Sequence, residues 1–356
     1  MTQLFGETYD RDAARRLTGH PQQVVGTDLY EALDGEARGQ RFVRLRAGDI
    51  DCDVAVDRGL DLARLSFRGL PVHWITPAGF RNAAALEPDA MQPAGWGELR
   101  TWPGGMLSTF GYDHVGVPAV YPNRHGHPMV SAVRSPIHGR SSYSPTYLRG
   151  HGLHADHVYV EGEVRQAAPF AEHLVLRRTI RASLGEPLVT IDDTIHNDGY
   201  TPERVQLLYH FGFGWPMLAA GTHVRMSPTD IIAATQEART DDPAVMPRPT
   251  RGATERVWDR ASTAGPQWAA LVNKNAGGRG PLAAVVEWDG GQLPHLIQWR
   301  IAGESMFSLG LELSTTGLDP SDGDIPVVEP GDARSFSLRL RFETGDTALS
   351  YLTGDR

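Results

Sequence analysis

Residues 335–343 read Ser-Phe-Ser-Leu-Arg-Leu-Arg-Phe-Glu, an unbroken alternation of polar and apolar side chains. In an extended chain the apolar side chains would share one face and the polar side chains would share the other. This pattern is typical of a strand with one buried and one solvent-facing side, as in antiparallel sheets. Residues 49–57 and 188–195 alternate in the same way. The stretch therefore predicts an antiparallel β-protein.

The rest of the chain extends this prediction to a large β-sandwich. Glycine and proline number 39 and 25 of 356 residues, which favours turns and short strands. Strands do not alternate regularly with helices, and the clearest helix is short, Arg11–Leu17 with Asp10 as its N-cap. We expect an all-β, large twisted antiparallel sandwich as a single domain over 1–356, with 1–40 as an N-terminal extension packed on it. Further predicted strands are 41–47, 157–164, 173–182, 205–210, 283–288, 295–301 and 306–313.

Two regions lack this alternation. Residues 76–156 are rich in Gly, Pro, Trp and His, and do not resemble sheet. Long irregular segments of compact domains tend to be functional, so we expect this one to carry function. Residues 227–266 are polar, and we interpret them as a loop excursion and not as a domain boundary.

Composition excludes several classes of protein. The formal net charge is −9 and no basic run is present, so we expect no nucleic-acid partner. No apolar stretch is long enough to span a membrane, and the first residues lack the apolar region of a signal peptide. The single cysteine, Cys52, excludes an internal disulfide. We expect a cytoplasmic enzyme or binding protein.

Histidines raise the question of a metal site, because seven of them fall between positions 114 and 157. The densest group, His151-x-x-His154-x-x-His157, would alternate faces on a strand. His125-Gly-His127 has no carboxylate close behind it. We therefore expect no metal site, and interpret these five histidines as solvated loop residues.

Three other residues are candidates for chemistry. His210 ends an apolar strand and opens onto a Gly-rich loop, where an imidazole could act as a general acid. Glu312 lies between two leucines, and burial there would raise its pKa and favour a role as a base. His138 lies in a Gly-flanked turn beside Arg140. The alternatives are a satisfied core histidine for His210, a cross-strand partner of an arginine for Glu312, and a backbone-bonded turn histidine for His138.

A sugar site would need flat apolar surfaces and bidentate donors. The aromatic residues that could stack on a sugar, unless they only fill the core, are Trp96, Trp102, Phe110, Tyr112, Trp215 and Trp299. The arginines that could bind oxygens are Arg58, Arg100, Arg140 and Arg300, and they would suit a sugar that bears an acidic group.

Motifs along the chain resemble those of one superfamily. They are the run 192–216 with His210, the run 293–299, Gly310-Leu-Glu312 and Val328-Glu-Pro-Gly331. Together they are similar to the galactose mutarotase-like (aldose 1-epimerase) superfamily. Asp57-Arg-Gly-Leu-Asp61, the run 104–113 and Pro136-Ile-His-Gly-Arg140 resemble its DUF4432-like branch, a domain of unknown function.

The resemblance implies a twisted sandwich that binds a sugar in a concave cleft. Glu312 would take the proton of the anomeric hydroxyl and His210 would protonate the ring oxygen, so that the ring opens and recloses with C1 inverted. The resemblance implies no cofactor. Two positions depart from the usual motif, since Leu313 replaces a proline and Tyr209 an asparagine. The residues expected to bind the sugar are His138, Arg140, Arg58, Trp102, Tyr112, Asp113, Gln298 and Trp299.

We therefore predict an epimerase that acts on a free or modified aldose, and the sequence leaves open whether that sugar is acidic. It should place Glu312 and His210 across one pocket, about a sugar ring apart. Asp113 and Glu287 are the candidates for the acid that holds a sugar hydroxyl. The alternatives are a non-catalytic sugar-binding or sugar-sensing protein and another carbohydrate enzyme, such as a lyase, hydrolase or isomerase. The expected partner is a small-molecule sugar, and the sequence leaves open whether the chain forms a homodimer.

Overall fold

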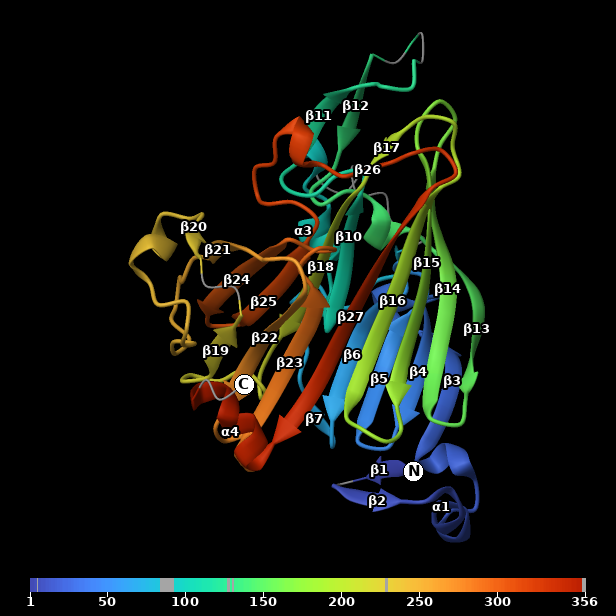
Figure 1. The fold of residues 1–356 in the computed structure, drawn as a ribbon, viewed down its shortest axis with the longest axis vertical. Helices are drawn as coiled ribbons and strands as arrows, with labels where there is room; N and C mark the ends of the chain where they lie inside the picture. Colours follow the sequence, from blue (N-terminus) through green and yellow to red (C-terminus); the bar gives the residue numbers. More distant parts are fainter. Residues whose placement is uncertain (5, 84–92, 127–128, 130, 228–229, 354–356) are drawn as a thin grey trace.

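Two large antiparallel sheets lie over one another and form most of the molecule (Figure 1). They are seen in a computed structural model that describes residues 1–4, 6–83, 93–126, 129, 131–227 and 230–353. The fold is the all-β sandwich predicted from the alternating stretches. Within the described residues, no helix is both long and apolar enough to cross a membrane.

The first sheet, called the large sheet, carries the candidate site. In spatial order its strands are β20 (Ile232–Ala233), β21 (Arg256–Ala261), β24 (His295–Gly303), β25 (Met306–Ser314), β18 (Gln206–Phe213), β10 (Leu107–Tyr112), β6 (Asp61–Phe67), β5 (Ile50–Ala55), β4 (Arg41–Ala47) and β3 (Val25–Glu31), with β7 (Leu70–Pro71) paired to β6.

The second sheet covers one face of the first. Its strands, in order, are β13 (Thr146–Leu153), β14 (His157–Ala167), β15 (His173–Ser183), β16 (Leu188–Asn197), β27 (Ala333–Thr344), β23 (Leu282–Asp289), β22 (Pro266–Asn273) and β19 (His223–Met226). Four two-stranded pairs are β1 (Thr2–Leu4) with β2 (Glu7–Tyr9), β8 (Trp74–Ile75) with β9 (Gly104–Gly105), β11 (Ala119–Pro122) with β12 (Ala132–Ser135), and β17 (Glu203–Arg204) with β26 (Val327–Val328). The α-helices within the described part of the chain are α1 (Arg11–Leu17), α3 (Glu98–Thr101) and α4 (Gly345–Thr353).

The stretches 335–343 and 188–195 alternate in burial as predicted, whereas Asp49, Asp53 and Asp57 of the stretch 49–57 are buried on the face expected to be solvated. On β27 the side chains of Phe336, Leu338, Leu340 and Phe342 are buried, and the residues between them are not. This strand lies between β16 and β23 in the second sheet. Helix α1 also begins as predicted, because the Asp10 carboxylate accepts a hydrogen bond of 2.6 Å from the Ala13 amide.

Three predictions about the organisation of the chain were wrong. The region 76–156 contains β10, a central strand of the large sheet, whose six residues are all buried. Because both of its faces are covered, its sequence shows no alternation. The excursion 227–266 contributes β21 to the same sheet. The expected extension 1–40 is also too long, since Val25–Glu31 is the edge strand β3 and only β1, β2 and α1 project at one end (Figure 1).

The hydrophobic core lies between the two sheets. Leu207, Tyr209 and Phe211 of β18 share it with residues of β27, and Phe67 stacks on Phe342 from the opposite sheet with their ring centroids 5.1 Å apart. Side chains alternate along a strand, so the core position of Tyr209 sends its neighbour His210 to the other face of the large sheet. We call this other face the outer face, and it carries the candidate site.

Candidate functional site

His210 and Glu312 meet on the outer face of the large sheet. They lie directly opposite each other on the adjacent strands β18 and β25. The His210 Nε2 atom is 3.2 Å from the Glu312 Oε1 atom, and the two side chains are 7% and 9% exposed. The prediction that they share one site on the fold therefore agrees with their placement. Their spacing differs from the prediction, because they touch each other and are not separated by a sugar ring.

Glycine at position 310 allows this contact. Gly310 precedes Glu312 by two residues on β25, so both face the same side. A Cβ atom there would lie 2.9 Å from His210 Nε2 and 3.2 Å from Glu312 Oε1. Gly212, directly opposite on β18, would meet the Gly105 carbonyl at 2.7 Å. Without side chains at this pair of positions, the imidazole and the carboxylate can lean over the strands towards each other.

Aromatic rings surround His210. Its ring centroid lies 5.0 Å from that of Trp102, 5.9 Å from that of Trp299 and 6.4 Å from that of Phe110. Trp74 contacts both Trp102 and Trp299, at 5.7 and 6.0 Å. Rings of this kind offer the flat apolar faces on which the C–H side of a sugar could stack.

Two hydrogen bonds orient the indoles. The Trp102 Nε1–H donates to the Ser108 hydroxyl at 2.9 Å, and Ser108 lies opposite His210 on β10. The Trp299 Nε1–H donates to the Glu255 carboxylate, also at 2.9 Å. Both tryptophans were predicted from the sequence, whereas Trp74, Ser108 and Glu255 were not. Nothing in their local sequence distinguishes these three, because the contacts depend on the strand order.

His138 is held beside this cluster in a left-handed turn with a φ of 55°. Its ring centroid is 5.1 Å from that of Phe110, and its Nδ1 accepts a hydrogen bond of 3.2 Å from the Gly116 amide. This bond leaves the proton on Nε2, so the ring presents an N–H donor. Burial, and then the nearby His210, lower the pKa of His138 to about 3, which keeps it neutral.

Burial also favours the uncharged forms of the central pair. It raises the pKa of Glu312 to about 8, with a smaller contribution from the charge of Glu255, and lowers the pKa of His210 to about 4. Because the two groups touch, they titrate as one unit. Between these values the pair holds a single proton, which can lie on either partner.

The other face of the same strand carries a different polar network. The Tyr209 hydroxyl donates to Asp193 at 2.7 Å, and the guanidinium of Arg178 binds both Asp193 oxygens at 2.6 and 2.9 Å. Arg178 also donates to Asp61 at 3.2 Å, and Asp61 accepts from the Thr109 amide of β10. The unusual tyrosine before His210 therefore fixes β18 to the second sheet.

Three of the predicted sugar-binding residues lie away from the pair. Gln298 faces the opposite side of the sheet from Glu312, is fully buried and donates to the Pro243 carbonyl at 2.7 Å. Tyr112 has a φ of 76° and packs in the core. Arg58 is buried and donates to Glu98 at 2.8 Å.

The remaining predicted charges are engaged elsewhere. Arg140 donates to Asp113 at 3.2 Å, so these two predicted residues bind each other. Glu287, the other candidate acid, lies on β23 in the second sheet, 3.2 Å from Arg339. Neither Asp113 nor Glu287 is among the residues that contact the pair. The polar groups that contact its aromatic walls are Ser108 and Glu255.

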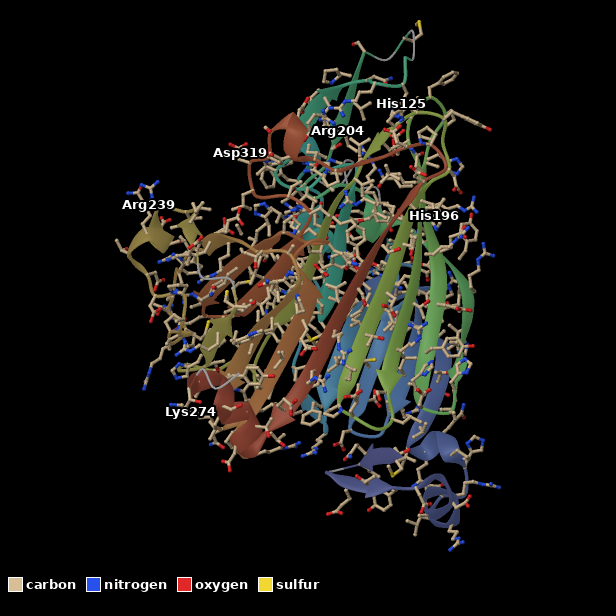
Figure 2. The ribbon with its side chains drawn as sticks, in the orientation of Figure 1. His125, His196, Arg204, Arg239, Lys274 and Asp319 are labelled. Carbon is tan, nitrogen blue, oxygen red and sulfur yellow. The ribbon has the colours of Figure 1, made fainter. Side chains whose placement is uncertain are left out.

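His125, His151 and His157 are less solvated than expected, whereas His154 is exposed. His125, near Arg204 at the upper end of the molecule (Figure 2), contacts Glu203 at 2.7 Å and is 17% exposed. His151 bonds to Thr27, and the rings of His154 and His157 stack at 5.0 Å. His127 lies outside the described residues. Among the residues that are described, no three His, Cys, Asp or Glu side chains gather as metal ligands.

The sequence pattern of DUF4432, a domain of unknown function, matches residues 37–342. The chain belongs to the DUF4432 family. No curated protein matches its sequence.

Solved structures share the fold of this DUF4432 chain. A protein from Klebsiella pneumoniae, named as a proposed aldose 1-epimerase, superposes with a TM-score of 0.80 at 19% identity, covering 92% of this chain and 85% of its own. A galactose mutarotase-like protein from Clostridium acetobutylicum gives 0.58 at 13% identity, covering 91% and 100%. The galactose 1-epimerase of Lactobacillus acidophilus gives 0.56 at 11%, covering 90% and 99%. At these identities the likeness establishes a galactose mutarotase-like fold.

Proposed function

We propose that this DUF4432 protein interconverts the anomers of an aldose by opening and reclosing the sugar ring. The observation that carries the proposal is the contact between His210 and Glu312, 3.2 Å apart in an aromatic-walled site. Ring opening needs one proton removed from the hydroxyl on C1 and one proton added to the ring oxygen. These two oxygens are bonded to the same carbon, so an acid and a base in contact with each other can reach both.

In this proposal the pair supplies both groups. Its single proton passes from Glu312 to His210, which makes a carboxylate and an imidazolium. The carboxylate accepts the proton of the C1 hydroxyl, and the imidazolium donates its proton to the ring oxygen as the C1–O bond breaks. The products are an open-chain aldehyde, a protonated Glu312 and a neutral His210. Those are the protonation states that burial favours.

Ring closure reverses the transfers. After rotation about C1–C2, His210 accepts the proton of the attacking hydroxyl and Glu312 donates its proton to the aldehyde oxygen. A proton jump from His210 back to Glu312 then restores the pair. His138 would donate its Nε2–H to a sugar oxygen, and Trp102 and Trp299 would stack on the ring.

We propose an uncharged aldose as the substrate, in place of the acidic sugar expected from the arginines. Three of the four arginines are bound to acids, namely Arg58 to Glu98, Arg140 to Asp113 and Arg300 to Asp241. By register, the outer-facing positions of β21, β24, β25, β18 and β10 hold no lysine or arginine. A carboxylate, sulfonate or phosphate placed there would meet Glu255 and Glu312 with no cation on these strands to offset the repulsion.

The experiment measures anomer exchange by NMR for neutral aldoses, with wild type, Glu312→Gln and His210→Asn. We expect each variant to slow exchange by about 100-fold or more, the usual contribution of general acid–base groups. Glu287→Gln is the matched control, since it removes a carboxylate from the other sheet, and should leave the rate unchanged. If wild type accelerates no aldose but binds one, the sugar-binding alternative replaces this proposal.

A further inference from the structure

A second imidazole–carboxylate contact lies on the outer face. The His295 Nδ1 atom of β24 is 3.1 Å from the Asp259 Oδ1 atom of β21, and the side chains are 30% and 16% exposed. The other Asp259 oxygen accepts from the Leu318 amide at 3.4 Å. We call His295 and Asp259 the second dyad.

The strand register places the second dyad next to the catalytic pair. Asp259 lies opposite Ile297, and Ile297 lies opposite Glu312. His295 is two residues from Ile297, so it faces the same side and is the diagonal neighbour of Glu312. Diagonal neighbours on one face of a sheet are about 7–8 Å apart. A sugar whose C1 lies at Glu312 could therefore reach His295 with a hydroxyl on a distant ring carbon.

Gly317, which has no side chain, leaves room for the second dyad. A Cβ atom on Gly317 would lie 2.9 Å from Asp259 Oδ2 and 3.0 Å from His295 Cε1. Any larger residue would displace one of the two side chains. The contact between His295 and Asp259 thus depends on a loop position outside both strands.

The geometry also determines the hydrogen-bonding role of His295. A carboxylate can only accept at the Nδ1 atom, so the neutral ring carries its proton there and has a lone pair at Nε2. Such a ring accepts a hydrogen bond from a hydroxyl. His138, on the other side of the pair, presents the opposite group, an N–H donor.

We propose that His295, held by Asp259, is a substrate-positioning residue that accepts a hydrogen bond from one hydroxyl remote from C1 and so determines which aldoses react. This inference rests on the proposed function and adds a specificity determinant to it. A site built to bind a hydroxyl discriminates strongly against the analogue that lacks it, because the partner group is then left unpaired.

The test compares exchange rates of one neutral aldose and its monodeoxy analogues in wild type, His295→Ala and His196→Ala. His196 is the matched control, an imidazole on β16 of the second sheet (Figure 2). We expect wild type to show a loss of about tenfold or more in kcat/KM for one analogue. In His295→Ala the parent sugar should fall to the level of that analogue, while His196→Ala should keep the difference.

An unchanged penalty in His295→Ala, with the fold shown intact by thermal unfolding, would overturn the inference. Asp259→Asn provides a second variant, and it should reduce the same penalty because it weakens the orientation of His295. If wild type exchanges no aldose, the proposed function fails separately. The same sugar series, measured as Kd by tryptophan fluorescence, then decides the role of His295 by the same criterion.

Discussion

Tyr209 and His210 are neighbours on β18, face opposite sides of the large sheet, and lie in opposite electrostatic surroundings. Tyr209 joins a network in which Asp193 receives bonds from Tyr209 and from Arg178. His210 is also buried, and it contacts a carboxylate that burial itself tends to neutralise.

The difference shows that one strand can place the residues that stabilise the fold on one face and the residues that could transfer protons on the other. In the Tyr209 network the Arg178 guanidinium contacts both Asp193 and Asp61, so each of these acids lies beside a cation. In the pair formed by His210 and Glu312, two protonation states differ by one short proton jump. An acid bound to a cation is suited to hold strands together, whereas a buried pair of an acid and an imidazole is suited to exchange protons with a ligand.

The largest effect on stability should come from removing the cation of the Tyr209 network, Arg178. Arg178→Met would leave Asp193 and Asp61 buried without their cation, and we expect a loss of about 3–5 kcal/mol in the free energy of unfolding, measured with denaturant. Arg181→Met, on the same strand, removes an arginine paired with Asp192 at the surface, and should cost less than about 1 kcal/mol. Equal losses in the two variants would mean that the buried arginine contributes no more to stability than the surface one.

The next effect concerns the geometry of the reactive side. Gly310→Ala places a methyl group against the His210 ring and the Glu312 carboxylate. Displacement of reacting groups by about 1 Å can cost about 100-fold in rate, and we expect a loss of that size in anomer exchange. Gly323→Ala, where a Cβ meets nothing closer than 4.0 Å, is the control. A normal rate in Gly310→Ala would show that the close contact of the pair is not needed.

The pH dependence tests the single shared proton. Above a pH of about 8 Glu312 loses its proton and the pair has no acid, and below about 4 His210 gains one and the pair has no base. We expect kcat/KM to fall about tenfold per pH unit outside these limits and to be level between them. A profile that rises steadily through this range would contradict a one-proton active form.

Tyr209→Phe tests whether a change on the inner face of β18 affects stability without affecting the outer face. It removes one hydrogen bond to a charged acceptor, and we expect a loss of about 1.5–3 kcal/mol in the free energy of unfolding. Anomer exchange at a temperature where the variant is folded should stay close to wild type, because the ring lies on the inner side of β18. A large loss of activity in folded Tyr209→Phe would mean that the two faces are coupled.

The last expected effect is on stability at the face of β18 that carries His210. The folded pKa of Glu312, about 8, exceeds its ordinary value of 4.5, so its contribution is fully present below about pH 4.5 and is lost as the pH rises towards 8. Wild type should therefore lose stability relative to Glu312→Gln over that range, by at most about 1.4 kcal/mol per pH unit. If the free energy of unfolding differed between wild type and Glu312→Gln by the same amount at pH 5 and at pH 8, a raised pKa of Glu312 would be contradicted.

Much of the fold was predictable, because strands with one solvent-exposed face show alternating polar and apolar residues in the sequence. Strands buried on both faces need not alternate: β18 was predicted from its apolar run, whereas β10 has neither pattern and was missed. The site was predictable to the extent that motifs identified His210, Glu312 and His138. Gln298 and Trp299 could not both have faced the pair, since consecutive residues of a strand point to opposite sides. The pairing of Arg58 with Glu98 depends on where α3 packs, which no local pattern reveals.

The order of strands in the large sheet has a consequence for how the proposed activity would arise during folding. Ser108, His210, Glu312 and Asp259 are side by side only because four distant segments of the chain have joined the same sheet. His210 and Glu312 come from strands far apart in the sequence, β18 and β25, so their contact depends on a long-range pairing. Recovery of turnover after dilution from denaturant should then lag behind the recovery of β-structure, and would report when the last of these long-range pairings has formed.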